Sequence, residues 1–214
     1  MTTAAAPKNP RQNVLRFLWR RSIPLDILQG VLIGFGLSLL LAFALISVQA
    51  QAMMTTVNGW KTTQACGVPG SWLVEAACAD TLPAVNAPQE AVYWQATVDA
   101  NGAKLDGSKD YVIQFPAGGL PPVSAFWSIT IAGSNRLMVE NPTHKYSVSD
   151  RSGLQKNPDG SIDVYLRPTA PAGHEANWLP TPGGGFMLWL RAYEPGPSVL
   201  DGTYRPPAVT EAQS

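Results

Sequence analysis

The residues of this sequence best suited to chemistry lie in a polar and aromatic group between positions 177 and 193. Aromatic rings stack on sugar rings and attract cations, while an arginine forms bidentate hydrogen bonds with carboxylates and phosphates. Such a group suits a carbohydrate, a lipid headgroup or another anionic ligand. Its members, our ligand-binding candidates, are Asn177, Trp178, Trp189, Arg191 and Tyr193.

A second interpretation of the same group is purely structural. Asn177 and Trp178 lie in a proline-rich loop beside Pro180 and Pro182, and they would fix its geometry. Arg191 would then pair with an acidic neighbour over a second core. Both interpretations stay open at the level of the sequence.

Recognisable catalytic motifs are missing from the sequence. It contains no G-x-S-x-G nucleophile elbow and no H-E-x-x-H motif, and its two histidines, His144 and His174, are too few for a multi-histidine metal site. A pair of acidic residues could still act as acid and base, but nothing singles out one pair. We therefore name no catalytic residue, expect no metal or cofactor, and favour a non-enzymatic protein.

Short stretches of alternating apolar residues must position the candidate group. From Ala91 onward, runs of period two are separated by turn signals such as Asn101-Gly102 and Asn141-Pro142, a pattern typical of half-buried antiparallel strands. With almost no helix among them, six to eight such strands predict an antiparallel, jelly-roll-like β-sandwich. The expected strands are 92–98, 111–115, 125–131, 136–139, 145–149, 161–167 and 185–193.

The N-terminal part of the chain is different in kind. Residues 27–48 carry no charge, and at 1.5 Å per residue they extend about 33 Å, enough to cross a hydrocarbon core of ~30 Å. We predict a transmembrane helix at 25–50. A cleaved signal peptide ending near Ala50 or Ala52 is the alternative, but signal h-regions are shorter than this run.

Charges on either side of the span predict its orientation. Five basic residues precede it (Lys8, Arg11, Arg16, Arg20 and Arg21), and the next basic residue after it is Lys61. The positive-inside rule then predicts a single-pass protein of the bacterial inner membrane with residues 1–24 in the cytoplasm and the main domain in the periplasm. The 10 basic and 14 acidic residues that follow Asp26 give the exported part a net charge of −4, so we expect no nucleic acid as partner.

The connection between span and sandwich contains both cysteines. Cys66 and Cys78 would form a disulfide in an oxidising compartment, around a short helix at about 71–80. We therefore divide the exported part into a juxtamembrane segment (51–90), a β-sandwich domain (91–209) and a tail (210–214).

The predicted span carries small residues at every fourth position, namely Gly30, Gly34, Ser38 and Ala42. A ridge of this kind lets two membrane helices approach closely. It predicts self-association of the helix or docking to a membrane partner.

Several motifs in order are similar to those of a known family. The sequence reads FWSIT at 126–130, NPTHKYSVSDR at 141–151, NPDGS at 157–161, NWLP at 177–180, LRAY at 190–193 and LDGTYRPP at 200–207. Over residues 91–209 the chain resembles the bacterial exported or membrane-anchored family known as domain of unknown function 1214. The resemblance implies an antiparallel β-sandwich and no established activity.

These observations favour a membrane-anchored envelope protein whose periplasmic sandwich binds an envelope glycan, a lipid or a protein partner. Two alternatives stay open: an enzyme that acts on envelope glycan or lipid through an acidic pair, and a structural subunit of a membrane complex held by its transmembrane helix. A concave groove lined by Trp178, Arg191 and Tyr193 would support binding, whereas two facing carboxylates would support the enzyme.

Overall fold

The computed structural model describes residues 24–83 and 85–212. The chain divides into two compact units, one ending at Leu45 and the other beginning at Ile46. The five basic residues expected in the cytoplasm lie outside the described residues.

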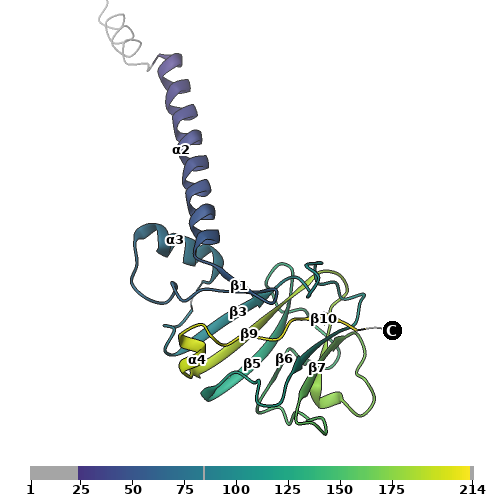
Figure 1. The fold of residues 1–214 in the computed structure, drawn as a ribbon. Helices are drawn as coiled ribbons and strands as arrows, with labels where there is room; N and C mark the ends of the chain where they lie inside the picture. Colours follow the sequence, from purple (N-terminus) through teal and green to yellow (C-terminus); the bar gives the residue numbers. More distant parts are fainter. Residues whose placement is uncertain (1–23, 84, 213–214) are drawn as a thin grey trace, which may run out of the picture. The chain divides into compact units, whose positions relative to one another are not determined.

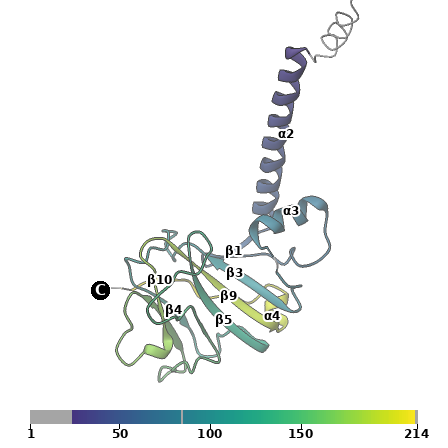
Figure 2. The same cartoon turned by 180° about the vertical axis from the view of Figure 1, so that it is seen from behind.

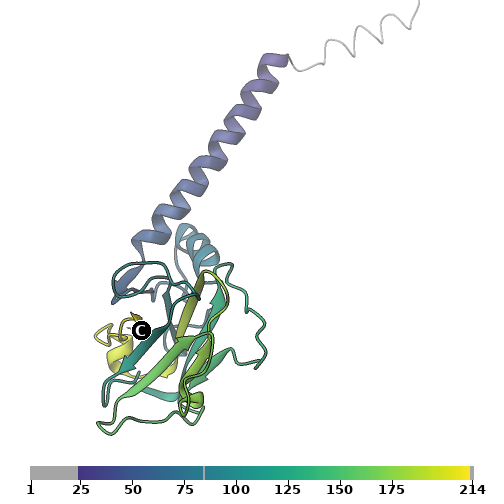
Figure 3. The ribbon, with the colours of Figure 1, turned by 90° about the vertical axis from the view of Figure 1, so that its right-hand side faces the viewer.

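The predicted span forms one unbroken helix, α2 (Leu25–Ala52), shown in Figure 3. It is long and apolar enough to cross a membrane, and none of its most apolar window is buried in protein. All four small residues of the ridge are exposed, and the Ser38 hydroxyl donates a hydrogen bond to the Phe35 carbonyl 2.8 Å away. The ridge is therefore apolar in character and open to contact.

The second unit is built from two β-sheets (Figures 1 and 2). In the described part of the chain, the larger sheet has the strand order β1-β2-β3-β9-β5-β6 and the smaller has the order β10-β4-β7-β8. The larger sheet consists of β1 (Thr55–Val57), β2 (Trp60–Thr62), β3 (Ala91–Ala96), β9 (Phe186–Pro195), β5 (Val123–Gly133) and β6 (Ser147–Ser149). The smaller consists of β10 (Thr210–Glu211), β4 (Tyr111–Phe115), β7 (Ile162–Arg167) and β8 (Trp178–Pro180). All pairs are antiparallel except β7 with β8, which is parallel.

One hydrophobic core lies between the sheets. Phe115 of the smaller sheet packs against Trp127 of the larger with ring centroids 5.4 Å apart, and Tyr111 meets Phe186 at 5.9 Å. The longer strands β3, β4, β5, β7 and β9 contribute alternate residues to the core, as the period-two pattern predicts. The mainly β, sandwich-like fold expected from the sequence is confirmed.

A short helix is joined at its C-terminal end to the outward face of the larger sheet. Helix α3 (Trp72–Thr81) begins at Ser71, whose hydroxyl accepts a hydrogen bond from the Val74 amide, and the predicted disulfide joins Cys66 to Cys78. The carbonyl of Thr81 accepts a hydrogen bond from Gln95 of β3 at 3.3 Å. Both the disulfide and the hydrogen bond from the sheet therefore hold α3 at its C-terminal end.

The sheet extends further toward the N-terminus than the 91–209 range expected for the sandwich. Strands β1 and β2 fall in the segment that we assigned to the juxtamembrane connection, and Trp60 is fully buried in the core. Its indole donates a hydrogen bond of 2.7 Å to the Pro207 carbonyl, which links the beginning of the sandwich to its end. Three-residue strands carry too little alternation to be recognised from sequence.

The expected strand at 136–139 is wrong. The backbone there makes a tight turn, in which the Gly133 amide donates to the Leu137 carbonyl and Arg136 has a φ of +67°. Asn135 stabilises the turn by accepting a hydrogen bond from the Leu137 amide. The remaining predicted strands are present with small shifts at their ends, and the chain also contains the short helix α4 (Pro197–Leu200).

Candidate functional site

The side chains of β9 alternate between the core and the outward face of the larger sheet. Leu188, Leu190 and Ala192 are fully buried, whereas Trp189, Arg191 and Tyr193 are half-buried on the opposite face. These last three were sequence candidates, and the structure brings them together in one row.

The neighbouring strand β3 adds a further aromatic residue to this row. Tyr93 lies opposite Arg191 in the register between β3 and β9, and Gln95 lies opposite Trp189. On the other side, Ser128 of β5 lies opposite Arg191. Arg191 therefore occupies the middle of a three-stranded outward surface.

A cavity of about 420 Å³ opens over this surface, and we call it the aromatic cavity. Its volume is in the range of known small-molecule sites. Its floor comes from β3 and β9, one wall from the segment after α3, and a further side from the turn that follows β5. The lining residues are Leu82, Pro83, Val85, Asn86, Tyr93, Arg136, Trp189, Arg191 and Tyr193.

The Arg191 guanidinium is positioned by two contacts. One nitrogen donates a hydrogen bond of 3.1 Å to the Thr130 hydroxyl, and the guanidinium carbon lies 6.0 Å from the centre of the Trp189 ring. Thr130 is only 4% exposed, so its hydroxyl is a fixed acceptor. Because a guanidinium has five N–H donors, Arg191 keeps several for a ligand.

Arg136 brings a second guanidinium to the aromatic cavity from the turn after β5. Its Nη1 donates a hydrogen bond of 2.8 Å to the Asp80 carbonyl at the end of α3. The left-handed conformation of its backbone is uncommon for a residue with a side chain, and the turn maintains it. Arg136 thus connects the wall of the cavity to the sheet.

Tyr193 is held by a stack of side chains. The Phe126 ring packs face to face with Tyr193 at 4.3 Å, and the Arg151 guanidinium lies 4.7 Å from the centre of the Phe126 ring. Arg151 is in turn fixed by a hydrogen bond to the Ala125 carbonyl. A ring supported in this way loses little entropy when a ligand stacks on it.

Tyr93 joins the floor of the aromatic cavity to its wall. Its hydroxyl donates a hydrogen bond of 2.8 Å to the Asn86 side chain, which itself donates to the Glu90 carboxylate. Burial of the ring raises the pKa of Tyr93 above its ordinary value, and the backbone of Asn86 partly offsets this. Tyr93 is therefore a neutral hydroxyl at physiological pH.

The electrostatic balance of the aromatic cavity is positive. Within residues 24–83 and 85–212, neither Arg136 nor Arg191 forms an ion pair with a carboxylate, and no acidic side chain lines the cavity. Asp80 and Glu90 are adjacent to the lining but outside it. The acidic neighbour that the structural interpretation gave to Arg191 is not found among the described residues.

Asn177 ends a 3-10 turn (Glu175–Asn177) and Trp178 begins β8 of the smaller sheet, apart from the other three candidates on β9. Asn177 is 2% exposed. Its side-chain oxygen accepts a hydrogen bond from the Gln155 amide, and its side-chain nitrogen donates to the carbonyls of Gln155 and Asp163. The Trp178 indole donates a 2.8 Å hydrogen bond to the Arg167 carbonyl. Since these polar groups already have partners in the protein, both residues hold the loop in place.

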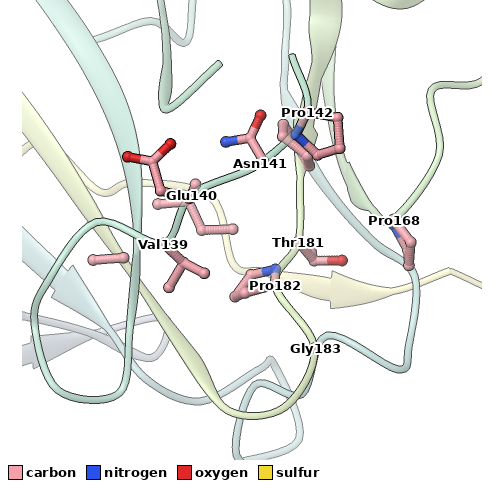
Figure 4. A pocket seen from close by; sticks show the side chains of 11 residues that line it. Val139, Glu140, Asn141, Pro142, Pro168, Thr181, Pro182 and Gly183 are labelled. Carbon is pink, nitrogen blue, oxygen red and sulfur yellow. The ribbon is translucent and has the colours of Figure 1, made fainter. Parts of the chain in front are cut away.

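A second, smaller cavity of about 200 Å³ lies among the prolines and is shown in Figure 4. It is lined chiefly by Val139, Pro142, Pro168 and Pro182, and we call it the proline pocket. The Glu140 carboxylate at its edge accepts a hydrogen bond of 2.7 Å from the Tyr146 hydroxyl and is highly exposed. The proline pocket has less polar chemistry to offer a ligand than the aromatic cavity.

Several lining residues of the aromatic cavity were missed by the sequence analysis. Tyr93 follows the period-two pattern of its strand, so its outward orientation was predictable. That it lies opposite Arg191 was not predictable, because this depends on which strands pair. Arg136 was placed in a strand, and the contribution of Leu82 and Asn86 depends on how the segment after α3 returns to the sheet. Among the described residues, no group of three potential ligands could hold a metal ion.

Together, the fold and the cavity define a class of protein: a β-sandwich with an outward-facing aromatic cavity, in a chain that also contains a helix long enough to span a membrane. The chain belongs to the family described as protein of unknown function (DUF1214), whose model matches residues 90–197. The resemblance noted from the sequence motifs is thereby confirmed.

Two solved structures resemble this chain. The VPA0106 protein from Vibrio parahaemolyticus is 33% identical, with a TM-score of 0.57, over 66% of this chain and 35% of that one. An uncharacterised protein from Burkholderia cenocepacia is 18% identical, with a TM-score of 0.43, over 64% of this chain and 32% of that one. This chain thus spans about a third of the length of both. No curated protein matches it.

Proposed function

We propose that this protein is a membrane-anchored binding protein of the bacterial cell envelope, whose β-sandwich takes a small anionic ligand with a ring or another flat apolar part. The observation that carries the proposal is the aromatic cavity, where three aromatic rings accompany two guanidiniums that have no carboxylate partner among the described residues. Rings bind the flat part of such a ligand, and the arginines bind its negative group.

The proposed location is the inner membrane, with the sandwich in the periplasm and the N-terminus in the cytoplasm. The length and hydropathy of α2 support an anchor, and the basic residues that precede it support this orientation. The disulfide between Cys66 and Cys78 fits an oxidising compartment. A protease added outside spheroplasts that contain the protein tests the orientation: cleavage of the sandwich supports it, and protection of the sandwich in intact spheroplasts would contradict it.

The enzyme alternative finds less support at this cavity, because its lining residues include no carboxylate. The structural-subunit alternative has one observation in its favour, namely the exposed ridge on α2. A helix that associates with another helix is compatible with a binding domain, so the two roles can coexist in one chain.

Binding is tested by titrating the full-length protein in mild detergent with benzenesulfonate, an aromatic anion, while following tryptophan fluorescence. We expect saturable binding that Arg191→Gln weakens about tenfold or more. Arg205→Gln is the matched control, because Arg205 is exposed and does not line the aromatic cavity. Equal binding by the two variants, or no saturable binding by the native protein, would overturn the proposal.

A further inference from the structure

The charges that line the aromatic cavity do not balance. Two permanent cations, Arg136 and Arg191, meet there, and the other polar lining groups are neutral: the Asn86 amide, the hydroxyls of Tyr93 and Tyr193, and the Trp189 indole. Arg191 is half-buried and Arg136 is exposed, and neither forms an ion pair with a carboxylate of the described residues. A half-buried guanidinium without a counter-charge, as at Arg191, is unfavourable, and a ligand that supplies the negative charge removes that cost. A monoanion would leave one positive charge uncompensated.

The two arginines come from different elements, so the fold of the chain is what brings both of them to the cavity. Arg191 belongs to β9 and is fixed by Thr130, whereas Arg136 belongs to the turn after β5 and is fixed by the Asp80 carbonyl. Each contact uses a single N–H, and each acceptor is an uncharged oxygen. The fixed positions of both guanidiniums leave their remaining donors and their full charges available to the ligand.

From this charge count we infer that the ligand is a dianion, a phosphate monoester carried on a sugar or another ring. The inference rests on the proposed function and specifies its ligand. A phosphate monoester carries between one and a half and two negative charges near pH 7, and its three terminal oxygens accept forked hydrogen bonds from more than one arginine. The rings of Trp189 and Tyr193 would pack against the ring that bears the phosphate, and the cavity of about 420 Å³ has room for both parts.

The test compares two probes of similar shape and different charge in the full-length protein. Phenyl phosphate is a dianion above its second pKa of about 6, and benzenesulfonate is a monoanion at every accessible pH. We expect phenyl phosphate to bind about tenfold or more tightly at pH 8, and its affinity to rise between about pH 5 and about pH 8 while that of benzenesulfonate stays level.

Substitution of the second arginine separates this inference from the proposed function. Arg136→Gln should weaken the binding of both probes, but it should weaken phenyl phosphate several-fold more than benzenesulfonate and so remove most of the preference for the dianion. Arg205→Gln again serves as the control. Equal affinity for the two probes would overturn the dianion inference while the proposed function stands, and binding of neither probe would overturn both.

Competition distinguishes the two sources of such a phosphate. Displacement of phenyl phosphate by glucose 1-phosphate identifies a free phosphorylated sugar. Displacement only by phosphatidic acid in mixed micelles identifies a lipid headgroup. Because that phosphate is carried on glycerol, this result would support the phosphate site and overturn the inferred ring.

Discussion

Arg191 of β9 lies directly opposite Tyr93 of β3, and both side chains line one cavity on the outward face of the larger sheet. The cation is held by Thr130 and the phenol by Asn86, so that each is fixed before a ligand arrives. The outward face of a sandwich is usually left to solvent, but here the C-terminal end of a disulfide-tied helix is hydrogen-bonded to it, and the segment after that helix lines a cavity over it. This arrangement turns a polar sheet surface into a candidate site.

The disulfide should support both stability and binding. In the chain-entropy model, closing a loop between residues twelve positions apart stabilises a fold by about 3 kcal/mol. We expect a Cys66→Ser, Cys78→Ser double variant to unfold at a lower temperature and to bind benzenesulfonate more weakly, since the segment after α3 forms a wall of the aromatic cavity. Differential scanning fluorimetry measures the first effect and a titration the second. Reductant should destabilise the native protein and leave the variant unchanged; an effect on both would contradict this explanation.

Asn177 should matter for stability and not for binding. Asn177→Ala removes three part-buried hydrogen bonds to the backbone of Gln155 and Asp163, at a cost of roughly 2–4 kcal/mol. Asn101→Ala, at an exposed turn, should cost little. Urea unfolding measures both variants. If folded Asn177→Ala protein lost its affinity for benzenesulfonate, the separation of Asn177 from the cavity would be refuted.

Trp60 tests whether the segment after α2 belongs to the sandwich. Trp60→Ala removes a fully buried indole and its hydrogen bond to Pro207, which should cost about 3–5 kcal/mol. Trp72 is 73% exposed, so Trp72→Ala should change the free energy of unfolding by less than about 0.5 kcal/mol. Similar decreases in the free energy of unfolding of the two variants would show that Trp60 of β2 is not part of the core of the sandwich.

The ridge on α2 makes a prediction about oligomeric state. Gly34→Ile places a branched side chain in the middle of the ridge, and it should reduce any self-association of the full-length protein in membranes and in detergent. Gly36→Ile is the matched control, because Gly36 lies on the helix but outside the ridge. Chemical crosslinking followed by gel analysis reads out both variants. An unchanged pattern for Gly34→Ile would remove the ridge as an association surface.

Acid should destabilise the sandwich through hydrogen-bonded surface carboxylates. The hydroxyls of Ser161 and Thr203 donate to Asp159 and Asp201, and these bonds lower the pKa of both carboxyl groups below the ordinary value. A carboxylate with a lowered folded-state pKa stabilises the fold above its unfolded pKa, and this stabilisation is lost as pH falls through the folded value. We therefore expect stability to decrease below about pH 4.

The matched test of this pH dependence is the Asp159→Asn, Asp201→Asn double variant. It keeps hydrogen-bonding groups at both positions but cannot titrate there. Its unfolding temperature should fall less steeply with acid than that of the native protein, and identical slopes would contradict the assignment.

Features that depend on neighbouring residues could be predicted from the sequence, whereas those that depend on contacts between distant segments could not. Alternation within β9 is local, so the shared outward face of Trp189, Arg191 and Tyr193 was predictable. The distance from Asn177 to that face was not, because β8 pairs with β7 in the smaller sheet although its residues are close to β9 in sequence. The position of Arg136 depends on a turn in which its backbone is left-handed, and the turn preferences of the individual residues do not predict this conformation.

The most direct test of this account is the ratio of benzenesulfonate dissociation constants for Arg191→Gln and Arg205→Gln, measured in the full-length protein after thermal unfolding confirms that both variants are folded. The account predicts a ratio of about ten or more, since Arg191 lines the aromatic cavity and Arg205 does not. A ratio near one would contradict the central claim that the aromatic cavity is an anion-binding site.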